Sequence, residues 1–191
     1  MNNLIARIQK LIDFRREIGQ PIDHHFLPGL SREYLQEKVS QYSFYFPAEL
    51  IDLYAWHNGT NEQDFLIFRD MAWLSFENSV SEYELNLEYF WSVFNSSDIN
   101  LEPARMFPFA GFEGFCLYLS YPGQAMCPNL GLPIIATGKG VLDPYFTSLD
   151  SMLDTVEEWF TVGQHSEYGC TVEETLERQI WRKYNSEVFG V

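Results

Sequence analysis

The sequence predicts an α+β fold, a single domain in which a small, mostly antiparallel sheet is packed with helices. Helical periodicity occurs mainly near the two ends of the chain and once in the middle, and short apolar runs typical of strands lie between. Strands and helices do not alternate one by one, as they would in a doubly wound parallel sheet. With 191 residues, of which 46% are hydrophobic and 17% aromatic, the chain can build one packed core.

The first 26 residues are expected to form a helix and a loop that pack on the domain. The apolar stripe of this helix comprises Leu4, Ile5, Ile8, Leu11, Ile12 and Ile18. Gly19 and Pro21 end the helix. The stripe must be buried, and the mixed charge of the opposite face favours docking on the domain's own sheet over a membrane. His24 and His25 are adjacent and would point to opposite sides of an extended chain, so we expect a surface loop and no metal site there.

A short helix beginning at Pro47 has both ends marked in the sequence. Proline suits a first helical turn, and Asn58-Gly59 is predicted to stop the helix because glycine readily adopts the left-handed conformation. Residues 65–68 and then 71–74 follow as two short buried strands or one continuous strand. The chain is therefore expected to pass from a helix, through a tight turn, into the sheet.

The longest predicted helix runs from Phe76 to Phe94 behind Ser75 as its N-cap. It carries several acids and no Lys or Arg, and like charges four residues apart slightly destabilise a helix. Solubility does not require acids to be clustered at a cost in helix stability, so the clustering suggests a binding surface. A solvated acidic face is the alternative. Glu84 and Glu88 share a face, but nothing indicates the burial that carboxylate catalysis needs. The acids predicted to contact a partner here are Glu77, Glu82, Glu84, Glu88, Asp98 and Glu102.

A hairpin is predicted around the turn Gly111-Phe112-Glu113-Gly114, between apolar strands at 106–110 and 115–119. This glycine pair is not a phosphate-binding loop, because no GxGxxG or Gly-Lys-Ser/Thr pattern is present and no helix begins after it. A further strand is expected at 132–137. A last short strand at Val141-Leu142 is expected to end at Asp143-Pro144.

Two helices are predicted near the C-terminus. Ser148 caps the first, and Thr171 to Glu174 form a capping box that opens the second within residues 161–191. The polar side of the first helix is acidic and has no basic partner along the helix. It is the second predicted partner surface, comprising Asp150, Asp154, Glu157 and Glu158.

The charge of the chain is distributed unevenly. The net charge is −15, and residues 70–177 contain seventeen acids but only Arg105 and Lys139 as bases. Such a field repels nucleic acid and would speed the encounter with a basic protein. Solubility is the alternative explanation, since an acidic surface also keeps a protein dispersed.

Enzymatic, metal-binding and membrane-spanning functions have little support in the sequence. Three cysteines without a CxxC pair argue against a disulfide framework or a thiolate zinc site, and they favour a reducing cytoplasm. No apolar run is long enough to span a bilayer, and no signal peptide is evident. A hydrolase would have to gather His57, Asp64 or Cys127 in one pocket, yet no spacing of nucleophile and base indicates this. His57 is better explained as a helix-end residue near the negative end of the helix dipole.

Several pieces of the chain together resemble the SUKH superfamily, which includes the fungal cell-wall-synthesis regulator and many bacterial immunity proteins. These pieces are the helix with Pro47, Leu50, Tyr54 and Trp56 that leads to Asn58-Gly59, then Trp73-Leu74-Ser75, Phe107-Pro108-Phe109-Ala110, Ser148-Leu149 and Trp159-Phe160. The resemblance covers residues 27–160, so the helices before and after look like additions. The family often has Gly-Asp or Gly-Asn at the hairpin turn. Here Glu113 is displaced, which leaves the hairpin register and any ligand role of the turn open.

The resemblance implies a protein-binding domain that is not an enzyme, and we expect neither a cofactor nor a metal. Bacterial members are similar to immunity proteins that neutralise a toxin, often a nuclease, and fungal members resemble signalling scaffolds. We therefore expect a cytoplasmic immunity protein, as in toxin-antitoxin systems, that binds a basic nuclease-type toxin through its acidic surface. A regulatory scaffold without a toxin partner is the alternative, and an uncharacterised hydrolase is the third. The chain is expected to be a monomer or a homodimer that binds neither nucleic acid nor membrane.

Overall fold

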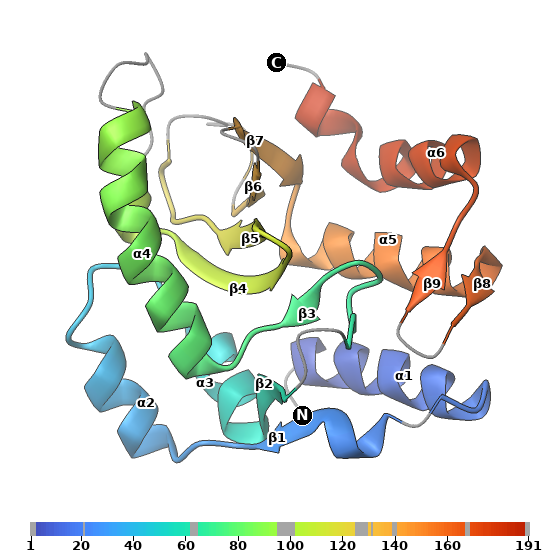
Figure 1. The fold of residues 1–191 in the computed structure, drawn as a ribbon, viewed down its shortest axis with the longest axis horizontal. Helices are drawn as coiled ribbons and strands as arrows, with labels where there is room; N and C mark the ends of the chain where they lie inside the picture. The colour runs from blue at the N-terminus through green and yellow to red at the C-terminus, as the bar shows by residue number, and fades with distance from the viewer. Residues whose placement is uncertain are drawn as a thin grey trace.

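The computed structural model describes residues 3–20, 22–61, 65–94, 102–124, 130, 132–138, 141–166 and 169–189. Its helices and sheets confirm the predicted α+β class (Figure 1). The α-helices of the described residues are α1 (Asn3–Glu17), α2 (Arg32–Val39), α3 (Ala48–Trp56), α4 (Phe76–Phe94), α5 (Leu149–Val162) and α6 (Glu174–Asn185). Short 3-10 helices are η1 (Asp23–His25), η2 (Pro103–Arg105) and η3 (Ser186–Phe189).

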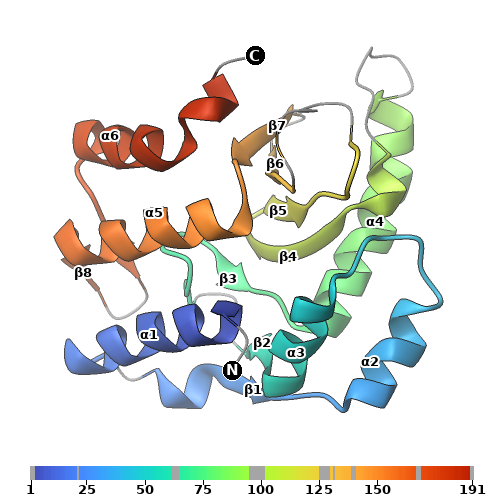
Figure 2. The same cartoon turned by 180° about the vertical axis from the view of Figure 1, so that it is seen from behind.

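An antiparallel five-stranded sheet lies at the centre, in the order β3-β4-β5-β6-β7. These strands are β3 (Ala72–Trp73), β4 (Phe107–Phe112), β5 (Phe115–Leu119), β6 (Ile134–Gly138) and β7 (Val141–Phe146). Two small sheets pair β1 (Phe26–Pro28) with β2 (His57–Thr60), and β8 (Gln164–His165) with β9 (Cys170–Thr171). Figures 1 and 2 show α4 on one side of the central strands and α6 on the other.

The predicted hairpin is present, and the structure defines its register. Phe112 pairs with Phe115, so Glu113 and Gly114 alone form the turn between β4 and β5. Both turn residues have positive φ, 47° for Glu113 and 79° for Gly114. Positive φ at both central positions is typical of the two-residue turns whose twist matches that of paired strands. The turn therefore presents the Glu113 side chain at the exposed end of the hairpin.

The last strand of the sheet continues further than the sequence predicted. Asp143-Pro144 was expected to end it at Leu142, but β7 continues to Phe146. Proline is tolerated here because β7 is an edge strand, which does not need every N–H for the ladder. Neighbouring β6 residues pair with Pro144 and Phe146, which leaves Tyr145 as an extra, bulged residue.

Asn58-Gly59 does not serve as the predicted helix stop. Helix α3 ends at Trp56, and the two residues belong to strand β2. Gly59 has φ +73°, and a Cβ there would lie 2.5 Å from the carbonyl oxygen of Leu74. The pair is therefore needed for close contact with the segment that enters α4 and not for ending α3.

Residues 65–68 do not form the predicted strand. They follow a non-helical, non-strand path in which the carbonyl oxygen of Leu66 accepts a hydrogen bond from Arg15 Nη1 at 3.2 Å. Arg15 is fully buried, and its guanidinium lies 4.3 Å from the centre of the Phe65 ring and 5.1 Å from that of Phe160. Burial lowers the pKa of Arg15 to about 10. The backbone of this stretch thus bonds to a side chain of α1 in place of a neighbouring strand.

Helix α1 packs into the main core. It contacts α3 and α5, and Leu4 and Ile8 line a small apolar cavity together with Trp73 and Phe109 of the sheet. Buried residues of α6 belong to the same core. Helices from both ends of the chain therefore contribute to one hydrophobic core.

Two local predictions at the ends of the chain are wrong. His25 is not in a surface loop: it is buried in η1, and its ring stacks on Phe65 at 4.2 Å between ring centres. The N-cap of α6 is Glu173, whose carboxylate accepts hydrogen bonds from the N–H groups of Thr175 and Leu176. Thr171, the expected cap, pairs instead in strand β9. In both cases the long-range packing of a short segment outweighs its local pattern.

Candidate functional site

The segment that enters α4 fixes the position of the first predicted acidic surface. Ser75 Oγ accepts a hydrogen bond from Asn78 N at 3.1 Å, which confirms the predicted N-cap. Asn58 Oδ1 accepts a second bond from Phe76 N at 2.8 Å. Strand β2 thus satisfies a backbone donor at the start of the helix, and this holds α4 at a defined angle to the sheet.

The acids of α4 bond only to neutral groups among the described residues. Glu77 accepts from Asn58 Nδ2 at 2.8 Å, Glu82 from Asn86 Nδ2 at 3.1 Å, and Glu84 from the Tyr42 hydroxyl at 3.2 Å. Glu77 and Glu84 are exposed, and Glu82 is partly buried. Their negative charges are therefore available to a cation from outside, because neutral hydrogen bonds compensate no charge.

The remaining predicted acids of this surface are less well defined. Glu102 is exposed and lies 3.9 Å from Arg105, a distance at which an exposed ion pair contributes little. Asp98 and the side chain of Glu88 lie outside the part of the chain that the structure describes. The surface is therefore defined here by Glu77, Glu82 and Glu84, which we call the α4 acids.

An exposed apolar side chain lies directly beside the α4 acids. Leu85 follows Glu84 and is 70% exposed, the most exposed of the large hydrophobic residues described. A single exposed leucine is common on protein surfaces. At the centre of a charged face it resembles the arrangement of many protein interfaces, in which an apolar centre is surrounded by polar groups.

A concave pocket joins this helix to the hairpin turn. It measures about 260 Å³ and includes Glu82 and Asn86 from α4 and Glu113 and Phe115 from the hairpin. Two carboxylates and an amide oxygen around one small pocket suit the ammonium or guanidinium group of a Lys or Arg side chain. Glu113 was not among the predicted binding residues. Its position in an exposed glycine turn is the sequence signal that could have identified it.

The acids of α5 differ from those of α4, because cations of other helices engage them. As the sequence indicated, no base lies along α5 itself, and the cations come from α1 and α6. Arg7 of α1 lies 3.0 Å from Asp150, 2.6 Å from Asp154 and 3.6 Å from Glu157. These acids therefore attach α1 to α5.

Two lysines complete the compensation of the α5 acids. Lys10 of α1 lies 2.8 Å from Glu157, and Lys183 of α6 lies 2.6 Å from Glu158. Hydrogen bonds from Lys183 and from the Tyr184 hydroxyl lower the pKa of Glu158. This second predicted partner surface is thus largely an internal contact between helices.

Cys116 is not placed to act as a nucleophile. Cys116 is buried, its Sγ donates to the Ala110 carbonyl at 3.2 Å, and burial raises the pKa of its thiol far above the usual range. Asp64 and Cys127, which the hydrolase hypothesis requires, lie outside the described residues. No group of three or more His, Cys, Asp or Glu residues that could hold a metal ion occurs among the residues with defined positions.

His57 is not stabilised as a cation at the end of its helix. Burial lowers the pKa of its imidazole below the usual value, and a backbone hydrogen bond with Leu27 only partly opposes this. Its Nδ1 lies 3.4 Å from the Leu27 carbonyl oxygen, and its ring packs near Phe26 and Trp56. The predicted interaction with the helix dipole is thus outweighed by desolvation.

Comparison with known proteins assigns no function, so the functional hypothesis rests on the α4 acids. No model of a known protein family matches the sequence, and no relative is found among curated proteins. Within the described ranges, none of the helices has the length and apolar character needed to cross a membrane.

Proposed function

We propose that this protein is a non-enzymatic protein-binding domain that receives a basic partner on the α4 acids. The observation that carries the proposal is the contrast between the two acidic helices. The acids of α5 are compensated by Arg7, Lys10 and Lys183, whereas the α4 acids bond only to neutral groups in the described structure. Like charges on one helix without a compensating cation cost some stability, and a basic partner would offset that cost.

The shape of the surface supports the same interpretation. Leu85 offers an apolar contact, and the pocket with Glu82 and Glu113 accepts one long cationic side chain. Exposed acids around such a contact mainly raise the rate of association, while a cation buried in the pocket slows dissociation. The partner would thus present a basic surface with at least one protruding Lys or Arg.

The first candidate for this partner is a basic nuclease-type toxin, with the present chain as its cytoplasmic immunity protein. A toxin that cleaves nucleic acid needs a basic surface for its substrate, and a chain of net charge −15 complements that surface. The resemblance to the SUKH superfamily supports the same role. By covering the toxin's basic surface, the α4 acids would exclude the nucleic acid.

A regulatory scaffold is the second candidate, and the exposure of Leu85 is the observation that favours it. A scaffold contact of this kind would depend on apolar burial and would persist at high salt, because screening weakens charge pairs but not the hydrophobic effect. The two candidates therefore differ in the salt dependence of binding.

The test is a pull-down of the tagged protein from lysate of the source cell, with elution by stepwise increases in salt. The variant E77Q/E82Q/E84Q removes three charges from the α4 acids. The control E33Q/E37Q/E187Q removes three exposed charges elsewhere. We expect a basic protein that the wild type and the control retain at low salt and that the α4 variant does not.

Mass spectrometry of the eluate then decides between the candidates. A nuclease domain in the released protein would support the immunity role, and a partner that stays bound at high salt would support the scaffold. Equal retention of the partner by both triple variants would contradict a role for the α4 acids.

A further inference from the structure

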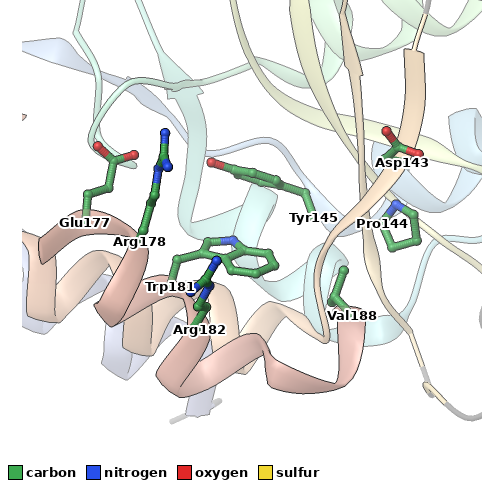
Figure 3. Close-up of a pocket in the computed structure, with 8 residues that line it drawn as sticks. All are labelled: Asp143, Pro144, Tyr145, Glu177, Arg178, Trp181, Arg182 and Val188. Carbon is green, nitrogen blue, oxygen red and sulfur yellow. The ribbon is translucent and has the colours of Figure 1, made fainter. Parts of the chain in front are cut away.

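A second concave site lies on the opposite side of the sheet from the α4 acids. It is an open groove of about 570 Å³ between the edge strand β7 and helices α6 and η3 (Figure 3). This volume is within the range of sites that bind small molecules. Its lining comprises Asp143, Pro144, Tyr145, Glu177, Arg178, Trp181, Arg182 and Val188.

The groove is not suited to binding another β-strand. Pro144 lacks the N–H that strand pairing would use, and the bulge at Tyr145 interrupts the regular spacing of the edge. The bulge instead directs a side chain away from the ladder, as bulges often do beside binding sites. Figure 3 shows Tyr145 reaching from β7 toward α6, where Arg178 and Trp181 project to meet it.

Two aromatic rings form the apolar part of the groove. The centres of the Tyr145 and Trp181 rings lie 5.9 Å apart, and the rings are inclined by 39°. Trp181 is 9% exposed, and the ring of Tyr145 also packs edge-on against Phe115 and Phe146. Neighbouring elements thus hold both rings in place, so a flat apolar ligand meets a surface that is already ordered.

Two arginines give the α6 side of the groove its positive character. Arg178 and Arg182 are four residues apart and lie on the same face of the helix. The acid that precedes them on α6, Glu177, is engaged by Arg69 through two hydrogen bonds of 2.9 and 2.8 Å. Its charge is therefore compensated from outside the groove.

The carboxylates near Arg178 are weak competitors for a ligand. Arg178 bonds to Glu174, but the two side chains are 68% and 75% exposed, and an ion pair so exposed contributes little. Asp143 lies at the opposite end of the groove from Arg178 (Figure 3). A ligand anion can therefore replace Glu174 at Arg178 without leaving a buried charge unpaired.

We propose that this groove binds a small aryl anion, a planar ring that carries a carboxylate, sulfonate or phosphate. The ring lies against Tyr145 and Trp181, and the anionic group takes hydrogen bonds from Arg178 and Arg182. Arginine suits this role because its planar fork binds such anions through two parallel N–H groups. The site is independent of the partner surface on α4, so either proposal can fail alone.

The test uses the dye 1-anilinonaphthalene-8-sulfonate, an aryl sulfonate whose fluorescence rises on binding. In the variant R178Q/R182Q we expect its Kd to rise by about 10-fold or more, because two charge-assisted hydrogen bonds are lost. The control R16Q/R32Q removes two exposed arginines of α1 and α2 and is expected to bind the dye like the wild type. Nile red, an uncharged dye, should bind equally to all three proteins.

A third variant tests the position of the ring. Val188→Trp places a bulky side chain in the groove and should weaken binding of both dyes, while circular dichroism checks that the fold is kept. Three results would overturn the proposal: no saturable binding of the sulfonate up to about 1 mM, equal affinity of R178Q/R182Q and R16Q/R32Q, or undiminished binding by the Val188→Trp variant.

Discussion

At the scale of single residues, Gly59 constrains the backbone next to the candidate site. Its positive φ of 73° and the absence of a side chain let β2 pass within van der Waals range of the backbone at Leu74 and Ser75. Asn58 beside it donates to Glu77 and accepts from Phe76 N. These two residues thus link the small sheet to the first turn of the helix that carries the candidate site.

The substitution Gly59→Ala tests this constraint. We expect a loss of about 2–4 kcal/mol in the free energy of unfolding, from an unfavourable φ and a collision with backbone atoms. Gly123→Ala is the matched control, because Gly123 has φ +78° and a Cβ added there would have no atom within 4 Å. We expect Gly123→Ala to lower the free energy of unfolding, measured by urea denaturation, by about 1 kcal/mol. Equal losses would show that the close approach at Leu74 is unimportant.

His57 gives a second residue-scale prediction, for pH dependence. Desolvation lowers the pKa of His57 in the folded protein, so the unfolded chain binds its proton more readily. The free energy of unfolding should therefore fall as the pH falls through the unfolded value of about 6.5. His57→Gln should reduce this fall between about pH 7.5 and 5.5.

Urea titrations at both pH values check this prediction. His24→Gln, which removes an exposed imidazole, serves as the control. If the His57→Gln variant and the wild type lost the same stability over this range, protonation of His57 would not contribute to the pH dependence.

At the scale of helices and strands, the principal finding concerns how charge is used. Sequence periodicity correctly placed acids on the polar sides of both α4 and α5. It could not show that α1 lies against α5, since the residues that pair across this contact are more than 140 positions apart. An acidic polar side thus forms an internal contact in α5, whereas in α4 the acids remain uncompensated.

The substitution Arg7→Met tests the contact between α1 and α5. It keeps much of the apolar stem but leaves Asp150, Asp154 and Glu157 without their shared cation. We expect a loss of about 1–3 kcal/mol in the free energy of unfolding at low salt, because the Arg7 side chain is only 17% exposed. High salt should reduce the difference.

The control for this substitution is Arg16→Met. Arg16 pairs with Asp13 and Asp23, but its side chain is 44% exposed, so the change should cost no more than about 0.5 kcal/mol. If both variants lost equal stability, the cluster around Arg7 would have no special role in holding α1 to α5.

At the scale of the whole molecule, helices from both ends of the chain share one hydrophobic core. Leu4 and Ile8 of α1 and Ile180 of α6 belong to the same cluster as Trp73 and Phe107 of the sheet. The helices that the family resemblance treats as additions are therefore packed as parts of the domain.

A shared core predicts cooperative unfolding. In urea, the transitions followed by tryptophan fluorescence and by far-ultraviolet circular dichroism should coincide, because α1 and α6 cannot leave without exposing the common core. A separate early loss of helical signal would contradict this and would indicate that a terminal helix detaches first. Wild-type protein suffices for this measurement.

The sequence alone determined the α+β class, the helices with a clear apolar stripe, the hairpin around Glu113-Gly114 and two of the N-caps, at Ser75 and Ser148. These features depend on neighbours within a few residues, so local periodicity, glycine and capping side chains are sufficient to predict them. The acids of the candidate surface on α4 were predicted in the same way.

Only the tertiary structure decided which acids remain uncompensated, where Asn58-Gly59 acts, and that Tyr145 and Trp181 meet beside Arg178. Each of these depends on segments far apart in the chain: α1 with α5, β2 with the start of α4, and β7 with α6. Local patterns also misplaced a strand at residues 65–68, because the buried Arg15 provides a hydrogen bond there that no sequence window contains. Packing between distant elements decides which of several local conformations of similar free energy forms. A local sequence pattern does not contain the information about those distant contacts.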